Sequence, residues 1–153
     1  MTPPIVSSTF DIAHWFLQRG EMERIFVSPL KLQRLFYLSQ ARYAGKHDGA
    51  PLMPSVFVVS EVGPLEPNIY RAIEHEPPKV SVHDLPEKIM AFVESIWQTY
   101  GSQELEALTR LAMQDPAFKE AESVSGLAEI IDLDAMRRHH TPSKNLHRSR
   151  KFQ

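Results

Sequence analysis

The sequence contains no cysteine, which excludes disulfides, thiolate nucleophiles and any zinc or iron–sulfur site that needs a cysteine ligand. No run approaches the roughly 20 apolar residues of a membrane-spanning helix. The first eight residues lack the basic and then apolar segments of an export signal. We therefore expect a cytoplasmic protein that does not enter a membrane.

Glycine is scarce as well, and the six glycines form neither a G-x-x-x-x-G-K phosphate loop nor a G-x-G-x-x-G dinucleotide motif. The H-E-x-x-H pattern of zinc proteases and the G-x-S-x-G pattern of serine hydrolases are also missing. The seven histidines show no metal-ligand spacing, and Glu74-His75-Glu76 is better explained as a solvated charge cluster. We predict no catalytic residue, no metal and no cofactor, although an enzyme of unrecognised type stays an alternative.

The residues that are present describe an ordinary globular chain. A length of 153 residues, with 42% hydrophobic and 24% charged side chains, suits one domain that buries a core. All 19 acidic residues lie at or before Asp134, where they outnumber 11 basic residues and give this part a net charge of −8. A negative body suits a basic protein partner better than a phosphate backbone.

The C-terminal end has the opposite charge. It is either a solvated, flexible end, which is the favoured interpretation, or an arm that binds nucleic acid. We therefore predict one helical domain over residues 1–136 and a basic tail over 137–153. The basic residues of this tail are Arg137, Arg138, Lys144, Arg148, Arg150 and Lys151.

Hydrophobic spacing predicts a mainly α fold, a compact bundle of about six or seven short helices with one small β element. The clearest start signal is Ser28 as N-cap followed by Pro29, which opens a helix that ends near Ala44. The β-branched run over residues 56–59 predicts a buried strand or an extended segment, and Gly63-Pro64 a turn. The first helix is expected over residues 9–19, with a Ser8–Asp11 capping box and an exit at Gly20. A last helix or extended segment is expected from Ile130 to Met136. Four further helices are expected to start at these signals: Glu66-Pro67, Asp84 with Glu87, Ser102, and Asp115-Pro116.

Apolar residues surround the helix that starts at Pro29, so it is expected at the centre of the fold. Lys31, Arg34 and Arg42 nevertheless share one side of this helix. They form either a solvated face, which the spacing favours, or part of a partner site.

Two segments have a more specific pattern. The first is VSPLKLQRLFYLSQ over residues 27–40, and the second is GPLEPNIY over residues 63–70. Together they resemble the Panacea domain of SocA-like antitoxins. The resemblance implies a protein that neutralises a toxin, usually encoded next to it, by direct contact; some relatives deliver the toxin to a cytoplasmic protease as adaptors. It implies no catalytic residue.

The same resemblance suggests partner-binding residues. An alternative is that the motif is scaffold, with Gly63-Pro64 as a required turn, Gln33 bonded to a buried backbone group and Tyr70 in the core. A third possibility, independent of the resemblance, is a nucleic-acid binder that uses the basic tail. The candidates for partner contact are Lys31, Gln33, Arg34, Tyr37, Glu61, Gly63, Pro64 and Tyr70.

Overall fold

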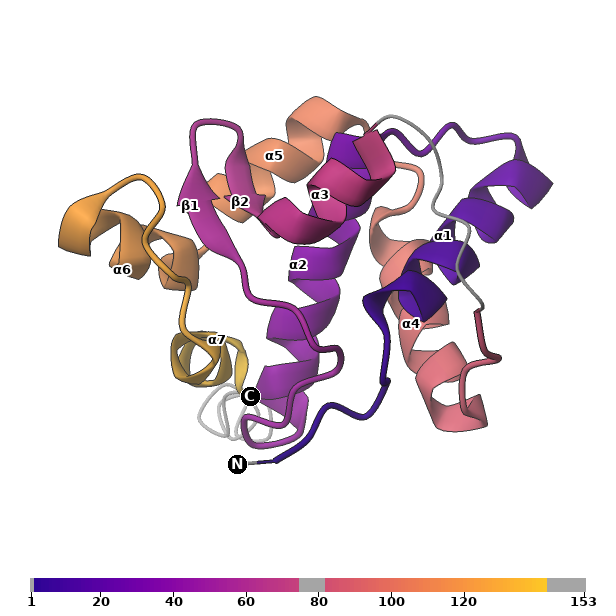
Figure 1. Cartoon of the computed structure of the whole chain (residues 1–153), viewed down its shortest axis with the longest axis horizontal. Helices are drawn as coiled ribbons and strands as arrows, with labels where there is room; N and C mark the ends of the chain where they lie inside the picture. The colour runs from indigo at the N-terminus through magenta and orange to yellow at the C-terminus, as the bar shows by residue number, and fades with distance from the viewer. Residues whose placement is uncertain (1, 75–81, 143–153) are drawn as a thin grey trace, which may run out of the picture.

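The computed structural model describes residues 2–74 and 82–142. Within them the chain forms seven α-helices and one two-stranded antiparallel sheet, which confirms the predicted fold class (Figure 1). In these residues no helix is long and apolar enough to span a bilayer. The elements are α1 (Thr9–Glu23), α2 (Pro29–Lys46), β1 (Val58–Ser60), β2 (Gly63–Leu65), α3 (Pro67–Glu74), α4 (Glu87–Tyr100), α5 (Leu105–Gln114), α6 (Pro116–Ser125) and α7 (Leu133–His140).

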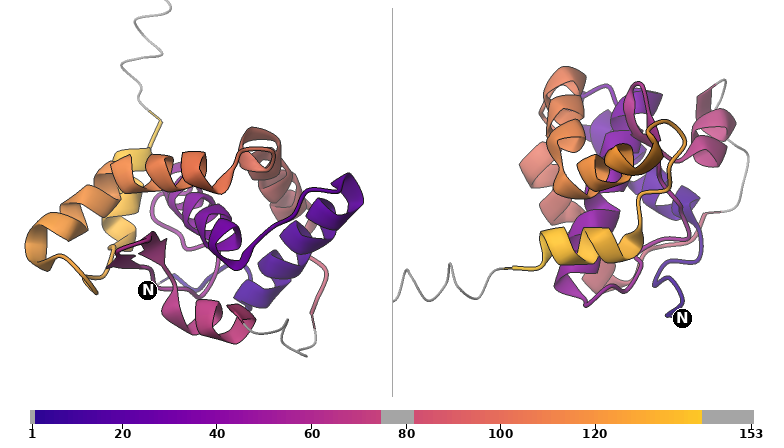
Figure 2. Two further views of the ribbon diagram at one scale, coloured as in Figure 1. Left: turned by 90° about the horizontal axis from the view of Figure 1, so that it is seen from above. Right: turned by 90° about the vertical axis from the view of Figure 1, so that its left-hand side faces the viewer.

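Helix α2 lies at the centre of the molecule, with α1 and α4 on one side and the hairpin, α6 and α7 on the other (Figure 1). It begins as predicted, because the Ser28 hydroxyl accepts a hydrogen bond from the Lys31 backbone N–H at 3.2 Å and Pro29 needs no partner. It contacts α1, α3, α4, α5, α7 and β2, and the two views of Figure 2 show it enclosed by them. Almost every side chain between Lys31 and Gly45 is therefore buried.

The hairpin places the turn two residues earlier than predicted. Ser60 pairs with Gly63, so Gly63-Pro64 belongs to β2 and the turn is formed by Glu61 and Val62. The Ser60 hydroxyl closes the turn, because it donates to the Gly63 carbonyl at 2.6 Å and accepts from the Val62 N–H at 3.2 Å. The prediction of a Gly63-Pro64 turn is thus wrong in register.

The other edge of β1 is paired as well. The Val59 N–H donates to the Glu129 carbonyl and the Ile131 N–H donates to the Phe57 carbonyl, both at 2.9 Å. The segment that joins α6 to α7 therefore lies antiparallel beside β1 and forms a bridge between Val58 and Ile130. This arrangement connects the hairpin to the C-terminal helices.

Some helix ends differ from the prediction, because close packing or a different hydrogen-bond partner overrides the local sequence signal. Helix α1 continues through Gly20, where an added Cβ would lie 2.7 Å from the Ile25 carbonyl oxygen, so this glycine serves packing and not a helix exit. Asp11 accepts a bond from the His83 backbone N–H at 2.9 Å in place of completing the predicted capping box. Helices α4 and α5 begin without side-chain caps, so the predicted caps Asp84 and Ser102 are wrong.

Helix α7 extends past the predicted domain boundary at Met136. It continues to His140 because Ala135 and Met136 are buried, and because Gly45 of α2 lets the backbone at His140 approach within 2.3 Å of the position of an added Cβ. Arg137 and Arg138 are therefore helical and part of the fold. The other predicted tail residues, Lys144, Arg148, Arg150 and Lys151, lie outside the described residues.

Candidate functional site

The two segments that carry the resemblance meet in the interior, where Arg34 of α2 contacts the hairpin. Its guanidinium Nη1 donates to the Pro64 carbonyl at 2.6 Å, and Nη2 donates to the Val62 carbonyl. Nε donates to the Thr109 hydroxyl of α5 at 3.2 Å. One side chain therefore holds three elements together, since planar donors spread in a fork can reach several acceptors at once.

Gln33 makes a second connection between the same segments. Its amide Oε1 accepts from the Glu66 backbone N–H at 2.8 Å, and its Nε2 donates to the Glu66 carbonyl at 3.3 Å. Gln33 is 1% exposed, so both bonds form away from water. This observation agrees with the scaffold interpretation of Gln33. We name the bonds of Gln33 and Arg34 to Val62, Pro64, Glu66 and Thr109 the motif junction.

The charge of Arg34 is buried without a counter-ion. The side chain is 0% exposed, and no carboxylate of the described residues lies within ion-pair distance. Desolvation lowers the pKa of Arg34 to about 10, which still leaves it charged at neutral pH. Carbonyl dipoles of the hairpin thus replace both water and an acidic partner.

The prediction of a solvated basic strip on α2 is wrong for two of its three members. Lys31 is 6% exposed and its Nζ donates to the Gly101 carbonyl at 2.7 Å, while Arg34 is enclosed by the motif junction. Desolvation lowers the pKa of Lys31, against an opposing effect of Glu104. Only Arg42 is exposed, over the ring of Tyr100. The error arises because α2 is surrounded, so helical spacing alone does not identify a solvent face.

Tyr37 belongs to a second buried chain of polar groups. Its hydroxyl donates to Asp115 Oδ2 at 2.6 Å, and His140 Nε2 lies 2.7 Å from Asp115 Oδ1. Desolvation and the neighbouring Asp115 raise the pKa of Tyr37 far above its usual value, so the hydroxyl stays protonated. No local sequence pattern indicates that Asp115 and His140 meet Tyr37, because the three residues lie on different elements. The arrangement ties α2 and α7 to the junction of α5 and α6.

The predicted partner-binding residues therefore divide by exposure. Glu61 is exposed at the hairpin turn and Tyr70 is half-buried on α3. The remaining six are buried, and they can influence a partner only through the surface that they support. These six are Lys31, Gln33, Arg34, Tyr37, Gly63 and Pro64.

An open groove lies directly over the motif junction, between the hairpin turn and α5. Val62, 43% exposed, stands at its edge. Apolar walls with a rim of both charges are typical of protein-binding surfaces. We call this surface the hairpin groove; its residues are Leu30, Arg34, Glu61, Val62, Leu105, Glu106, Thr109, Arg110 and Met113.

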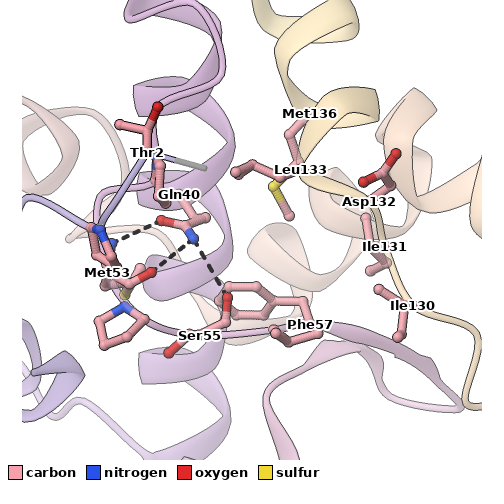
Figure 3. Close-up of a pocket in the computed structure, with 14 residues that line it drawn as sticks. Thr2, Gln40, Met53, Ser55, Phe57, Ile130, Ile131, Asp132, Leu133 and Met136 are labelled. Atoms are coloured by element: carbon pink, nitrogen blue, oxygen red, sulfur yellow. Dashed lines mark hydrogen bonds between the residues drawn. The ribbon is translucent and has the colours of Figure 1, made fainter.

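A second hollow lies between α2 and α7 (Figure 3). It has a volume of about 350 Å³, and its walls include Met53, Phe57, Leu133 and Met136. The amide of Gln40 lies in it but is fully engaged, with Oε1 accepting from two backbone N–H groups at 2.9 and 3.1 Å and Nε2 donating to the Met53 carbonyl at 3.0 Å. We call this hollow the α7 pocket; its walls are mostly apolar, and the exposed Asp132 also lines it.

The basic side chains of α7 are paired with acids. Arg137 and Arg138 bind Asp134, and Arg138 and His139 bind Glu120, at N–O distances of 2.9–3.0 Å. Neutralised guanidinium groups attract phosphates less strongly than free ones. For Arg137 and Arg138, the geometry therefore favours a structural role over nucleic-acid binding.

Among residues 2–74 and 82–142, no group of three or more histidine, aspartate or glutamate side chains is placed to hold a metal ion. Comparison with known proteins adds no relative, since no family model, no curated protein and no solved structure matches this chain.

Proposed function

We propose that this protein is an antitoxin that neutralises a partner toxin by binding it, with the hairpin groove as the contact surface. The observation that carries the proposal is the motif junction. The two segments that resemble the antitoxin family are far apart in the sequence, yet Gln33 and Arg34 of the first bond directly to Pro64 and Glu66 of the second. Because both segments form one junction beneath one groove, we expect them to support the same binding surface.

The form of the groove favours a protein partner. Leu30, Val62, Leu105 and Met113 supply apolar contact area, and the exposed carboxylates of Glu61 and Glu106 suit a basic toxin. The fixed charge of Arg34 beneath the surface keeps the turn carbonyls in place, which preorganises the contact. Delivery of the bound toxin to a cytoplasmic protease would use the same surface and stays a prediction.

Co-expression with the product of the neighbouring gene tests the proposal. The product alone is expected to stop growth, and the antitoxin to restore growth and co-purify with it. Val62→Asp places a charge on the groove and should weaken the complex by roughly tenfold or more, because an unpaired charge is costly in an apolar contact.

The matched control is Val82→Asp. Val82 is 39% exposed, close to the 43% of Val62, but does not line the groove. It should leave growth rescue and affinity unchanged. A neighbouring product that is harmless alone and does not co-purify would contradict the antitoxin function, whereas equal rescue by both variants would contradict only the assignment to the groove.

A further inference from the structure

The segment beside β1 leaves one strand edge unpaired. The bonds from Val59 to Glu129 and from Ile131 to Phe57 flank the Val58–Ile130 bridge, so this pair is the non-hydrogen-bonded type of an antiparallel ladder. In that geometry the N–H and C=O of Ile130 point away from β1. No other backbone group of the described residues bonds to either of them. The backbone at Ile130 is thus available to another strand.

The side chains around this edge form an apolar outer face. Val56 is 56% exposed and Ile130 58% exposed, and Val58 between them is half-buried. The residues that alternate with them along the two segments are buried in the core; these are Phe57, Val59 and Ile131. Alternation along a strand therefore places a contiguous apolar surface next to free backbone groups.

The α7 pocket opens at the same edge. Its lining residues include Val56 and Ile130, which are exposed, and Phe57 and Met136, which are buried. Figure 3 shows Ile130, Phe57 and Met136 around the pocket. A strand added beside Ile130 could therefore insert an apolar side chain there while its backbone pairs with the edge. Strand addition of this kind combines main-chain bonds with pockets for alternate side chains.

The charges near Ile130 determine which kind of segment can bind at this edge. Glu129 and Asp132 flank Ile130 in the sequence, and Asp132 is exposed. A second copy of this chain would bring equal negative charges together, whereas a segment with lysine or arginine would be attracted.

We propose that the Ile130 edge binds an extended, basic segment of a partner protein, in which apolar residues alternate with lysine or arginine, by adding it as a strand. This surface is separate from the hairpin groove and does not depend on the antitoxin function. A β-bulge limits the pairing, because Ala128 and Glu129 both face Val59, with Ala128 at φ +70°. The added strand is therefore short, centred on Ile130.

The test uses the full chain, labelled with ¹⁵N, and a capped heptapeptide in which lysine alternates with valine. At saturating peptide, the exchange of the Ile130 amide proton with solvent should slow by about tenfold or more, because it gains a hydrogen bond. The amides of Val59 and Ile131 are bonded in the free protein and should be protected in both states. Unchanged exchange at Ile130, or chemical-shift changes confined to pocket residues away from the edge such as Gln40, Met53 and Met136, would overturn strand addition.

Charge and surface are tested separately. A heptapeptide with glutamate in place of lysine should bind roughly tenfold more weakly. Asp132→Asn should weaken the lysine peptide, while Asp84→Asn, which removes the same charge from an exposed site off this edge, should not. Val56→Asp should weaken binding, with Val82→Asp as its control. The proposed basic segment would be contradicted if the lysine and glutamate peptides bound equally well. It would also be contradicted if a variant at the edge and its control had equal effects on binding.

Discussion

At the scale of single residues, the motif junction depends on how closely the backbone approaches Arg34. Gly63 has φ +105°, and a Cβ built there would lie 3.0 Å from both Cζ and Nη2 of Arg34. A larger residue would be strained in its backbone and would also push against the guanidinium. Gly63 therefore lets the turn carbonyls reach the buried cation.

Gly63→Ala separates these two effects when it is compared with Gly126→Ala. Gly126 also has a positive φ, +77°, but nothing lies within 4 Å of its added Cβ. We expect Gly126→Ala to cost about 1 kcal/mol from backbone strain, and Gly63→Ala to cost about 2 kcal/mol more because of the contact with Arg34. Urea unfolding of both variants measures the difference, and equal losses would show that packing on Arg34 contributes nothing.

The structural roles of some of these residues could be predicted from the sequence and those of others could not, for a physical reason. Ser28 and Pro29 act within one turn of helix, so their roles follow from local chemistry. Arg34 has no local partner, and its three acceptors come from β2, the turn before it and α5. A charged residue whose solvation is supplied by distant backbone cannot be distinguished from a solvated one by spacing alone.

At the scale of helices, Asp115 joins four of them. It lies between α5 and α6, receives the Tyr37 hydroxyl from α2 and contacts His140 of α7. Burial by itself would raise the pKa of Asp115, but hydrogen bonds from His140 and Tyr37 outweigh it, so the pKa lies below its usual value. The ionised carboxylate is thus the form that the folded state prefers.

This shift predicts a loss of stability in acid. Because the folded pKa is depressed, the contribution of Asp115 is present above its unfolded pKa and is lost as the pH falls through the folded pKa. Asp115→Asn should lower the free energy of unfolding by about 1–3 kcal/mol near neutral pH. The difference in unfolding free energy from wild type should narrow as the pH falls from neutral to below the ordinary pKa of an aspartate, because the wild-type carboxylate then takes up its proton.

Urea unfolding across this pH range checks the prediction, with the exposed Asp84→Asn as the control that changes little. If the free energies of unfolding of wild type and Asp115→Asn differed by the same amount at all pH values, this would contradict the role of the carboxylate charge.

Helix ends were predicted less well than helix positions. The hydrophobic spacing located α2 and α4, because a buried stripe repeats along the whole element. The predicted helix ends lie at Gly20 and near Ala44, yet Gly20 and Gly45 both lie inside helices where another segment approaches too closely for a side chain. Such glycines serve tertiary contacts, which a single sequence does not show.

At the scale of the whole molecule, two polar networks of the described residues connect elements in the interior. Tyr37 bonds to Asp115, and Arg34 bonds to the Pro64 carbonyl. The two surfaces that we propose as binding sites, the hairpin groove and the Ile130 edge, lie at separate places on the fold. An acidic body with these surfaces is suited to a basic protein partner.

Hydrogen–deuterium exchange of the full chain, alone and in complex with the neighbouring gene product, tests the central claim most directly. Binding in the hairpin groove predicts slower exchange in residues 60–66 and 105–113, with little change in α4. Unchanged exchange in those two segments, or protection confined to another part of the chain, would contradict it.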